Sequence, residues 1–286
     1  MQKGAQPVID ISGSSTLFPL SAQISKCAAQ TIKIELAQID SGNTVSGLQD
    51  LCQGKVKLFG ANREVNPDMM TDIHCGGIDL EKFEVARYAL VVIINKKNPH
   101  AEEMQSSPLS GRELTNLLLA ARSWKDIREY WQNEERIVRL YPPLESGEFE
   151  IVKNSLFPGN MITQSDVPGL SIESDKQAII DNVIADANAV GIVDYSSYQR
   201  CQNKNQLSAI PVNGMHVSSA IINGSDSAYP LAVTLYLYAE RNAYETDKTL
   251  RSFINYYLSH ELDFLDKLGY LYPSKKGYAG NRDTVP

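Results

Sequence analysis

Hydrophobic and polar positions along this chain follow two different periods, and segments of the two kinds alternate. Short apolar or alternating runs are typical of strands, and longer stretches with apolar residues three or four positions apart are typical of helices. The predicted strands are residues 8–11, 32–37, 56–61, 83–95, 137–141, 190–193 and 229–239. The predicted helices are residues 17–30, 45–52, 112–121, 148–156, 176–187, 246–258 and 262–268. Strands that alternate with helices predict parallel pairing in an α/β sheet.

Three short polar turns lead into predicted helices, and the first two follow predicted strands. They are residues 12–16 (SGSST), 41–44 (SGNT) and 146–148 (SGE). A serine or threonine there can cap the helix, and the free N–H groups and positive dipole end of a helix attract anions. If the three turns converge, they predict an anion-binding site.

Size and charge narrow the class of protein. The 286 residues suit one large domain or two lobes of roughly 100–150 residues. The net charge is -7, and no basic stripe is present, so we expect no nucleic-acid partner. No apolar run is long enough to span a membrane. The polar start suggests an exported protein whose signal was removed, although a cytosolic protein would have the same start.

The four cysteines are Cys27, Cys52, Cys75 and Cys201. Cys52 ends a predicted helix, and Cys75 lies in a nearby glycine-rich loop. A bond between them would close a loop of about 23 residues, worth roughly 3 kcal/mol in the entropic description. The alternative is that all four are free thiols. The four histidines have no metal-ligand spacing, and we expect neither a metal nor a cofactor.

Several segments together match a known family in order and spacing. They are GSSTLFP at residues 13–19, SGNTVSGL at 41–48, LCQG at 51–54, GANR at 60–63, VGIVDY at 190–195, YPL at 229–231 and GY at 269–270. With these segments the chain resembles the phosphate-binding proteins of ABC import systems, within the type II periplasmic binding proteins. The resemblance runs from about Ile11 to Tyr272.

The resemblance implies a two-lobed α/β fold with the ligand cleft between the lobes. Lobe one would contain residues 1–95 and 215–286, lobe two residues 96–214, and the hinge strands would lie near 93–98 and 210–216. The implied function is capture of inorganic phosphate or a related oxyanion by lobe closure, and delivery to an ABC permease. The protein would be a periplasmic or otherwise extracytoplasmic monomer without enzymatic activity. Cysteines at similar places in relatives favour the Cys52–Cys75 disulfide.

The implied ligand-binding residues come from the three turns and two arginines. They are Ser14, Ser15, Thr16, Ser41, Gly42, Asn43, Arg63, Arg139, Ser146, Gly147 and Glu148. Arg63 could instead be a surface arginine paired with Glu64 or Asp68.

The third turn departs from the family pattern, which usually reads Ser-Gly-Thr with an arginine close before it. Here Glu148 replaces the threonine, and Arg139 lies seven residues before Ser146. A carboxylate would repel a phosphate dianion strongly in a desolvated site. Either Glu148 is protonated or bonded to a protonated phosphate oxygen, or it faces solvent, where the helix dipole favours it.

Two other functions follow if Glu148 excludes phosphate. The same fold could serve as a sensor, adhesion factor or scavenger for a non-phosphate ligand, with the carboxylate favouring a cationic or zwitterionic one. An enzyme with Glu148 or Glu145 as general base is the third hypothesis, but no second catalytic group is visible nearby in the sequence.

Overall fold

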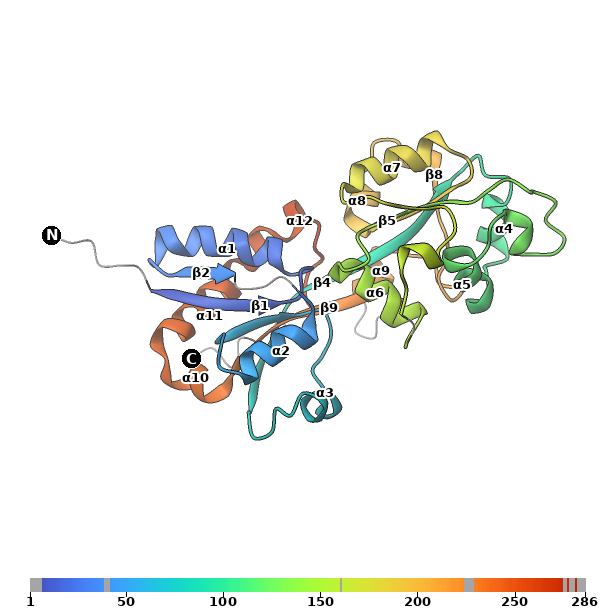
Figure 1. Cartoon of the computed structure of the whole chain (residues 1–286). Coiled ribbons are helices and arrows are strands. Elements are labelled where there is room, and N and C mark those ends of the chain that lie inside the picture. Colours follow the sequence, from blue (N-terminus) through green and yellow to red (C-terminus); the bar gives the residue numbers. More distant parts are fainter. Residues whose placement is uncertain are drawn as a thin grey trace. The chain divides into compact units, whose positions relative to one another are not determined.

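The computed structural model describes residues 7–38, 42–159, 161–223, 229–274, 277 and 281. The chain divides into two compact units: unit 1 is Met1–Arg87 with Val233–Pro286, and unit 2 is Tyr88–Ala232. Strand β4 (Leu80–Asn95) contains the first crossing between units, and the second falls at the start of strand β9 (Ala232–Glu240) (Figure 1). The first crossing lies before the hinge strand expected near residues 93–98. The second lies after the hinge strand expected near residues 210–216.

Unit 1 is a layer of strands with helices packed on it. Its further strands are β1 (Val8–Gly13), β2 (Glu35–Gln38) and β3 (Leu58–Ala61). Its helices are α1 (Phe18–Thr31), α2 (Thr44–Cys52), α3 (Pro67–Asp72), α10 (Arg241–Thr246), α11 (Lys248–His260) and α12 (Leu265–Leu268). The strand order is β2-β1-β3-β9, with β1 parallel to both neighbours and β9 antiparallel to β3. Helix α1 packs on β2 and α11, and α2 packs on β1 and β3.

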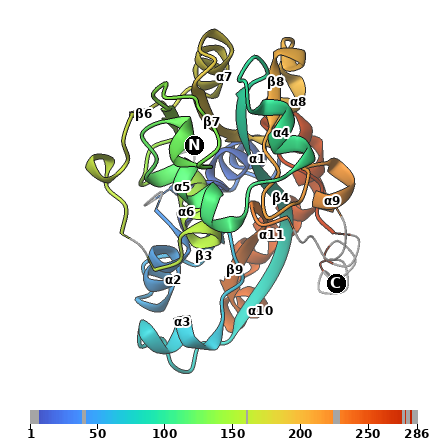
Figure 2. The same ribbon diagram turned by 90° about the vertical axis from the view of Figure 1, so that its right-hand side faces the viewer.

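Unit 2 has the same kind of organisation (Figure 2). Besides β4, its strands are β5 (Val138–Tyr141), β6 (Leu170–Ile172), β7 (Ala189–Asp194) and β8 (Leu207–Ala209). Its helices are α4 (Ala101–Ser106), α5 (Gly111–Leu119), α6 (Gly147–Leu156), α7 (Lys176–Ala185), α8 (Tyr195–Arg200) and α9 (Ser219–Asn223). Strand β5 lies between β6 and β7 and is parallel to both, whereas β4 is antiparallel to β7 and β8. The expected α/β sheet is therefore confirmed, with antiparallel strands added to its parallel ones.

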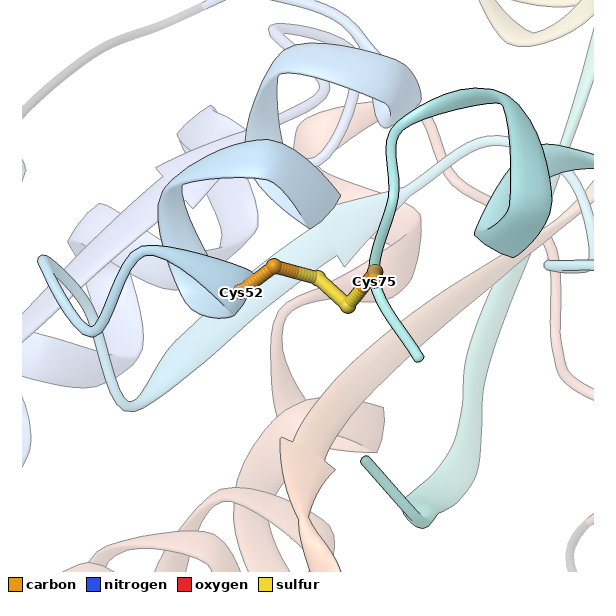
Figure 3. Close-up of a disulfide and its surroundings, with 2 residues drawn as sticks. All are labelled: Cys52 and Cys75. Carbon is orange, nitrogen blue, oxygen red and sulfur yellow. A yellow bond between two sulfur atoms is a disulfide. The ribbon is translucent and has the colours of Figure 1, made fainter. Parts of the chain in front are cut away.

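A disulfide joins Cys52 at the end of α2 to Cys75 after α3, with the two Cα atoms 5.6 Å apart (Figure 3). The expected pairing is confirmed, and Cys27 and Cys201 are free thiols. The bond lies beside a core cluster in which the rings of Phe59 and Tyr238 stack with centroids 5.1 Å apart.

The two tryptophans pack inside unit 2. Trp131 stacks on His100 at a centroid distance of 3.9 Å, and burial lowers the pKa of that histidine. Glu103 accepts hydrogen bonds from the Trp131 indole at 2.8 Å and from Arg128 at 2.8 Å. Among the residues described, no helix has both the length and the apolar character that a bilayer span requires.

Candidate functional site

The first turn begins where β1 ends, at a glycine that no other residue could replace without strain. Gly13 has a φ of +107°, and a Cβ there would lie 2.2 Å from the carbonyl oxygen of Gly60 on β3. The N–H of Ser14 donates to that same carbonyl at 2.9 Å, and the N–H of Ser15 donates to Gly42 of the second turn at 3.1 Å. These two N–H groups therefore fix the turn and are not free for a ligand.

Three hydroxyl groups around this turn are buried, and the described part of the chain offers them no hydrogen-bond partner. They belong to Ser12, Ser14 and Thr16, which are 2%, 3% and 6% exposed. Helix α1 has Leu17 as its N-cap and receives no side-chain cap, so the expected serine or threonine cap is wrong here. Since buried polar groups are nearly always paired, three unpaired hydroxyls in one turn indicate a place for a hydrogen-bonding ligand.

In the second turn Ser41 lies outside the described residues. Gly42 forms an isolated bridge with Ser14, which joins the first two turns within unit 1. Asn43 is the N-cap of α2: its side-chain oxygen accepts from the N–H groups of Val45 at 2.9 Å and Ser46 at 3.0 Å. The amide oxygen of Asn43 is thus used for capping, as its position before a helix favours.

The end of β3 is attached to the start of α2. The hydroxyl of Thr44 donates to the side-chain oxygen of Asn62 at 2.9 Å and accepts from the N–H of Asn62 at 3.1 Å. Both residues are buried, and the half-buried Arg63 follows directly. The carboxyl ends of β1, β2 and β3 therefore lead into the residues that the sequence singled out in unit 1, since parallel neighbours end on the same edge.

The third turn lies in unit 2, at the start of α6. Ser146 is the N-cap, and its hydroxyl accepts from the N–H of Phe149 at 3.1 Å. Here the predicted cap is confirmed. Gly147 is buried at the first helical position, and Glu148 follows it. The turn comes after β5, and the neighbouring parallel strands β6 and β7 are likewise followed by α7 and α8.

These parallel strands bring charged groups from separate segments together. The ammonium of Lys176, on the first turn of α7, lies 2.7 Å from Glu148 and 3.2 Å from Asp194, which ends β7. It also donates to the hydroxyl of Tyr88 at 2.9 Å, and that hydroxyl donates to Glu148. Burial favours the neutral amine, but attraction to the two carboxylates outweighs it and raises the pKa of Lys176. We call these four residues the Lys176 cluster.

Glu148 therefore does not face solvent as a lone helix-start carboxylate: its side chain is 20% exposed and paired with a cation. The third turn has no arginine close before it in its own segment. Its positively charged neighbour is Lys176, which belongs to helix α7. Sequence reasoning missed Lys176, Tyr88 and Asp194. One signal was available, because a lysine in the first turn of a helix faces the positive dipole end, at a cost of about 0.3–1 kcal/mol.

Arg139 does not reach the third turn as a ligand-binding arginine. It is fully buried in β5, and its guanidinium donates to the backbone carbonyls of Leu117 at 2.9 Å, Ala121 at 2.6 Å and Pro168. Burial lowers the pKa of Arg139, although an arginine stays protonated in proteins. The sequence expectation is corrected: this arginine joins helix and loop backbone to β5.

Comparison with known proteins adds independent findings. The phosphate-binding protein PstS of Staphylococcus aureus (strain USA300) is 22% identical over 280 residues, covering 96% of this chain and 80% of the relative. PstS of Staphylococcus epidermidis (strain ATCC 35984) is 24% identical over 282 residues, covering 96% of this chain and 81% of the relative.

Solved structures show the same fold. A possible phosphate binding protein from Planctomyces limnophilus DSM 3776 superposes with a TM-score of 0.80 at 20% identity, covering 99% of this chain and 98% of that one. An ABC-type phosphate transport receptor from Vibrio cholerae superposes with a TM-score of 0.72 at 17% identity, covering 93% and 100%. The family model described as a PBP superfamily domain matches residues 2–261. This chain therefore belongs to the PBP superfamily and has the α/β fold of the periplasmic binding proteins.

Proposed function

We propose that this chain is a solute-binding protein that captures inorganic phosphate outside the cytoplasm and delivers it to an ABC permease, without catalysing a reaction. The observation that carries the proposal is the set of buried, unpaired hydroxyls of Ser12, Ser14 and Thr16. Hydroxyls at the carboxyl ends of parallel strands suit a small oxyanion, which can accept several hydrogen bonds at once. The names of the relatives, phosphate-binding and phosphate transport proteins, support the same ligand.

Glu148 does not by itself favour a cationic ligand, because Lys176 faces it at 2.7 Å and it is not a lone carboxylate. The alternative of a cationic ligand rested on a lone carboxylate in the third turn. The Lys176 cluster as a whole has one ammonium and two carboxylates, so the proposal of an anionic ligand rests on the unpaired hydroxyls and on the names of the relatives. The Cys52–Cys75 disulfide supports a location outside the cytoplasm, because disulfides persist in oxidising compartments. Lobe closure and the monomeric state remain predictions from the family resemblance.

Titration calorimetry of the dialysed protein with phosphate, sulfate, arsenate and a phosphomonoester tests the proposal. We expect phosphate to bind in the micromolar range or tighter and sulfate to be rejected. Ser14→Ala and Thr16→Val should each weaken phosphate binding about 10- to 100-fold, the value of one hydrogen bond to a charged group. Ser21→Ala is the matched control, because that buried hydroxyl is already bonded to Tyr257 at 3.1 Å.

Three results would contradict the proposal or the observation that carries it. No heat with any oxyanion would exclude phosphate as the ligand. Turnover of a phosphomonoester or an ester by the wild-type protein, lost in Glu148→Gln, would instead indicate an enzyme. A variant set in which Ser14→Ala and Ser21→Ala behave alike would show that the unpaired hydroxyls do not contact the ligand.

A further inference from the structure

One ammonium group lies among three acceptors in the Lys176 cluster. A lysine ammonium has three N–H donors, and Lys176 has three acceptors within reach: Tyr88 at 2.9 Å, Glu148 at 2.7 Å and Asp194 at 3.2 Å. The hydroxyl of Tyr88 donates to the same Glu148 oxygen, Oε1, that faces the ammonium. One carboxylate oxygen thus occupies two donors of different side chains.

The three acceptors differ in how firmly they are held. Asp194 has a side chain only 2% exposed, and its second oxygen caps α8 by accepting from the N–H of Ser197 at 2.8 Å. Tyr88 is 3% exposed within β4. Glu148 is 20% exposed, and its contacts in the described part of the chain all use Oε1. Glu148 is therefore the acceptor that can leave for water at the lowest cost.

An oxyanion can take the position of a carboxylate oxygen, because both accept charge-assisted hydrogen bonds from the same donors. We propose that Lys176 and Tyr88 are anion-binding groups of unit 2, and that Glu148 is an internal counterion which occupies them until the anion replaces it. The inference rests on the proposed function for the identity of the anion. It adds two ligand-binding residues outside the three turns and assigns Glu148 the role of a competitor that sets the affinity.

Replacing the competitor should strengthen binding. Glu148→Gln keeps the shape and removes the charge that competes with the ligand, so we expect tighter phosphate binding by about tenfold or more. The effect should be similar for arsenate, because the competition depends on charge and not on the identity of the oxyanion. Lys176→Met and Tyr88→Phe each remove a donor and should weaken phosphate binding about 10- to 100-fold.

The control is a second lysine–glutamate pair of unit 2. Lys125 and Glu134 lie 2.6 Å apart on the surface, with both side chains exposed, so Glu134→Gln should leave anion affinity unchanged. Calorimetric titration of the four variants and the wild type gives the affinities. Tyr88→Phe keeps the test valid if Lys176→Met, which leaves two carboxylates without their cation, does not fold.

The outcomes separate this inference from the proposed function. Phosphate binding by the wild type with unchanged or weaker binding by Glu148→Gln would overturn the counterion role alone. Weaker phosphate binding by Glu148→Gln together with newly gained sulfate binding would show instead that Glu148 accepts a ligand proton. No binding by the wild type but measurable binding by Glu148→Gln would support the counterion and refute the proposed function. No binding by either protein would overturn both.

Discussion

Arg139→Lys separates a structural arginine from a ligand-binding one. The guanidinium is fully buried and donates to three backbone carbonyls, those of Leu117, Ala121 and Pro168. A lysine at the same place keeps the charge but lacks the rigid fork, so one ammonium cannot replace all three bonds. Each carbonyl left unpaired in the interior costs about 1–3 kcal/mol. We expect a loss of about 2–4 kcal/mol in the free energy of unfolding and no change in phosphate affinity.

Urea unfolding followed by tryptophan fluorescence measures the loss, because both tryptophans, Trp124 and Trp131, lie in unit 2 with Arg139. Calorimetry of the folded variant measures phosphate affinity. Arg136→Lys is the matched control: Arg136 is exposed three residues earlier, and surface substitutions usually change stability by less than about 0.5 kcal/mol. A variant with unchanged unfolding but phosphate affinity weakened tenfold or more would refute the reasoning, since the guanidinium would then reach the ligand.

Three further predictions concern stability. Cys52→Ser/Cys75→Ser should lose about 3 kcal/mol in urea unfolding, given the sequence separation of 23, and a reductant should reproduce the loss in the wild type. Gly13→Ala should lower the melting temperature and abolish phosphate binding, because its Cβ would meet a carbonyl oxygen 2.2 Å away; an unchanged melting temperature would contradict this. The pKa of Glu103 is lowered, chiefly by a hydrogen bond from Tyr130, so its stabilisation is present above the ordinary carboxyl pKa and lost as pH falls below it. The urea midpoint of Glu103→Gln should therefore depend less on pH below about 5 than that of the wild type.

The longer helices and strands could be predicted because their buried positions are occupied by apolar residues that recur regularly along the sequence. Strand β4 was expected at 83–95 and begins at Leu80, and α7 begins at Lys176 as expected. The helix expected at 246–258 is divided at Asp247, whose side chain caps α11 by accepting from two N–H groups. Strand β2 starts at Glu35, three residues later than expected, because the backbone at Lys33 has a φ of +61°. Such local side-chain and backbone choices leave no periodic signal.

The polar turns could be located from the sequence, whereas the partners of their charged side chains could not; that the turns bind a ligand stays a prediction. Ser14, Thr16 and Ser146 were identified because serines and threonines beside a glycine-containing turn before a helix are a local signal. The pairing of Glu148 with Lys176 depends on the order of strands in the sheet, in which β6 and β7 both lie beside β5. The sequence of neither strand indicates that it is a neighbour of β5. For Arg139 the sequence did not indicate which face of the sheet its side chain lies on, nor which backbone carbonyls it contacts there. The chemistry of a turn could be deduced from the sequence, whereas its counterions required the fold.

The order in which the chain supplies its two units has a consequence for biosynthesis. Unit 2 is one uninterrupted segment, Tyr88–Ala232, whereas unit 1 needs β9 and the last helices. Two buried hydrogen bonds join the first and last parts of unit 1: Ser21 to Tyr257 at 3.1 Å, and the Tyr270 hydroxyl to the Thr16 carbonyl at 2.7 Å. During synthesis unit 2 can therefore complete its core first. The N-terminal residues of unit 1 cannot complete theirs until the C-terminal residues of that unit have been made. The polar turn at residues 12–16, near the beginning of the chain, can therefore complete its contacts only when the end of the chain has been made.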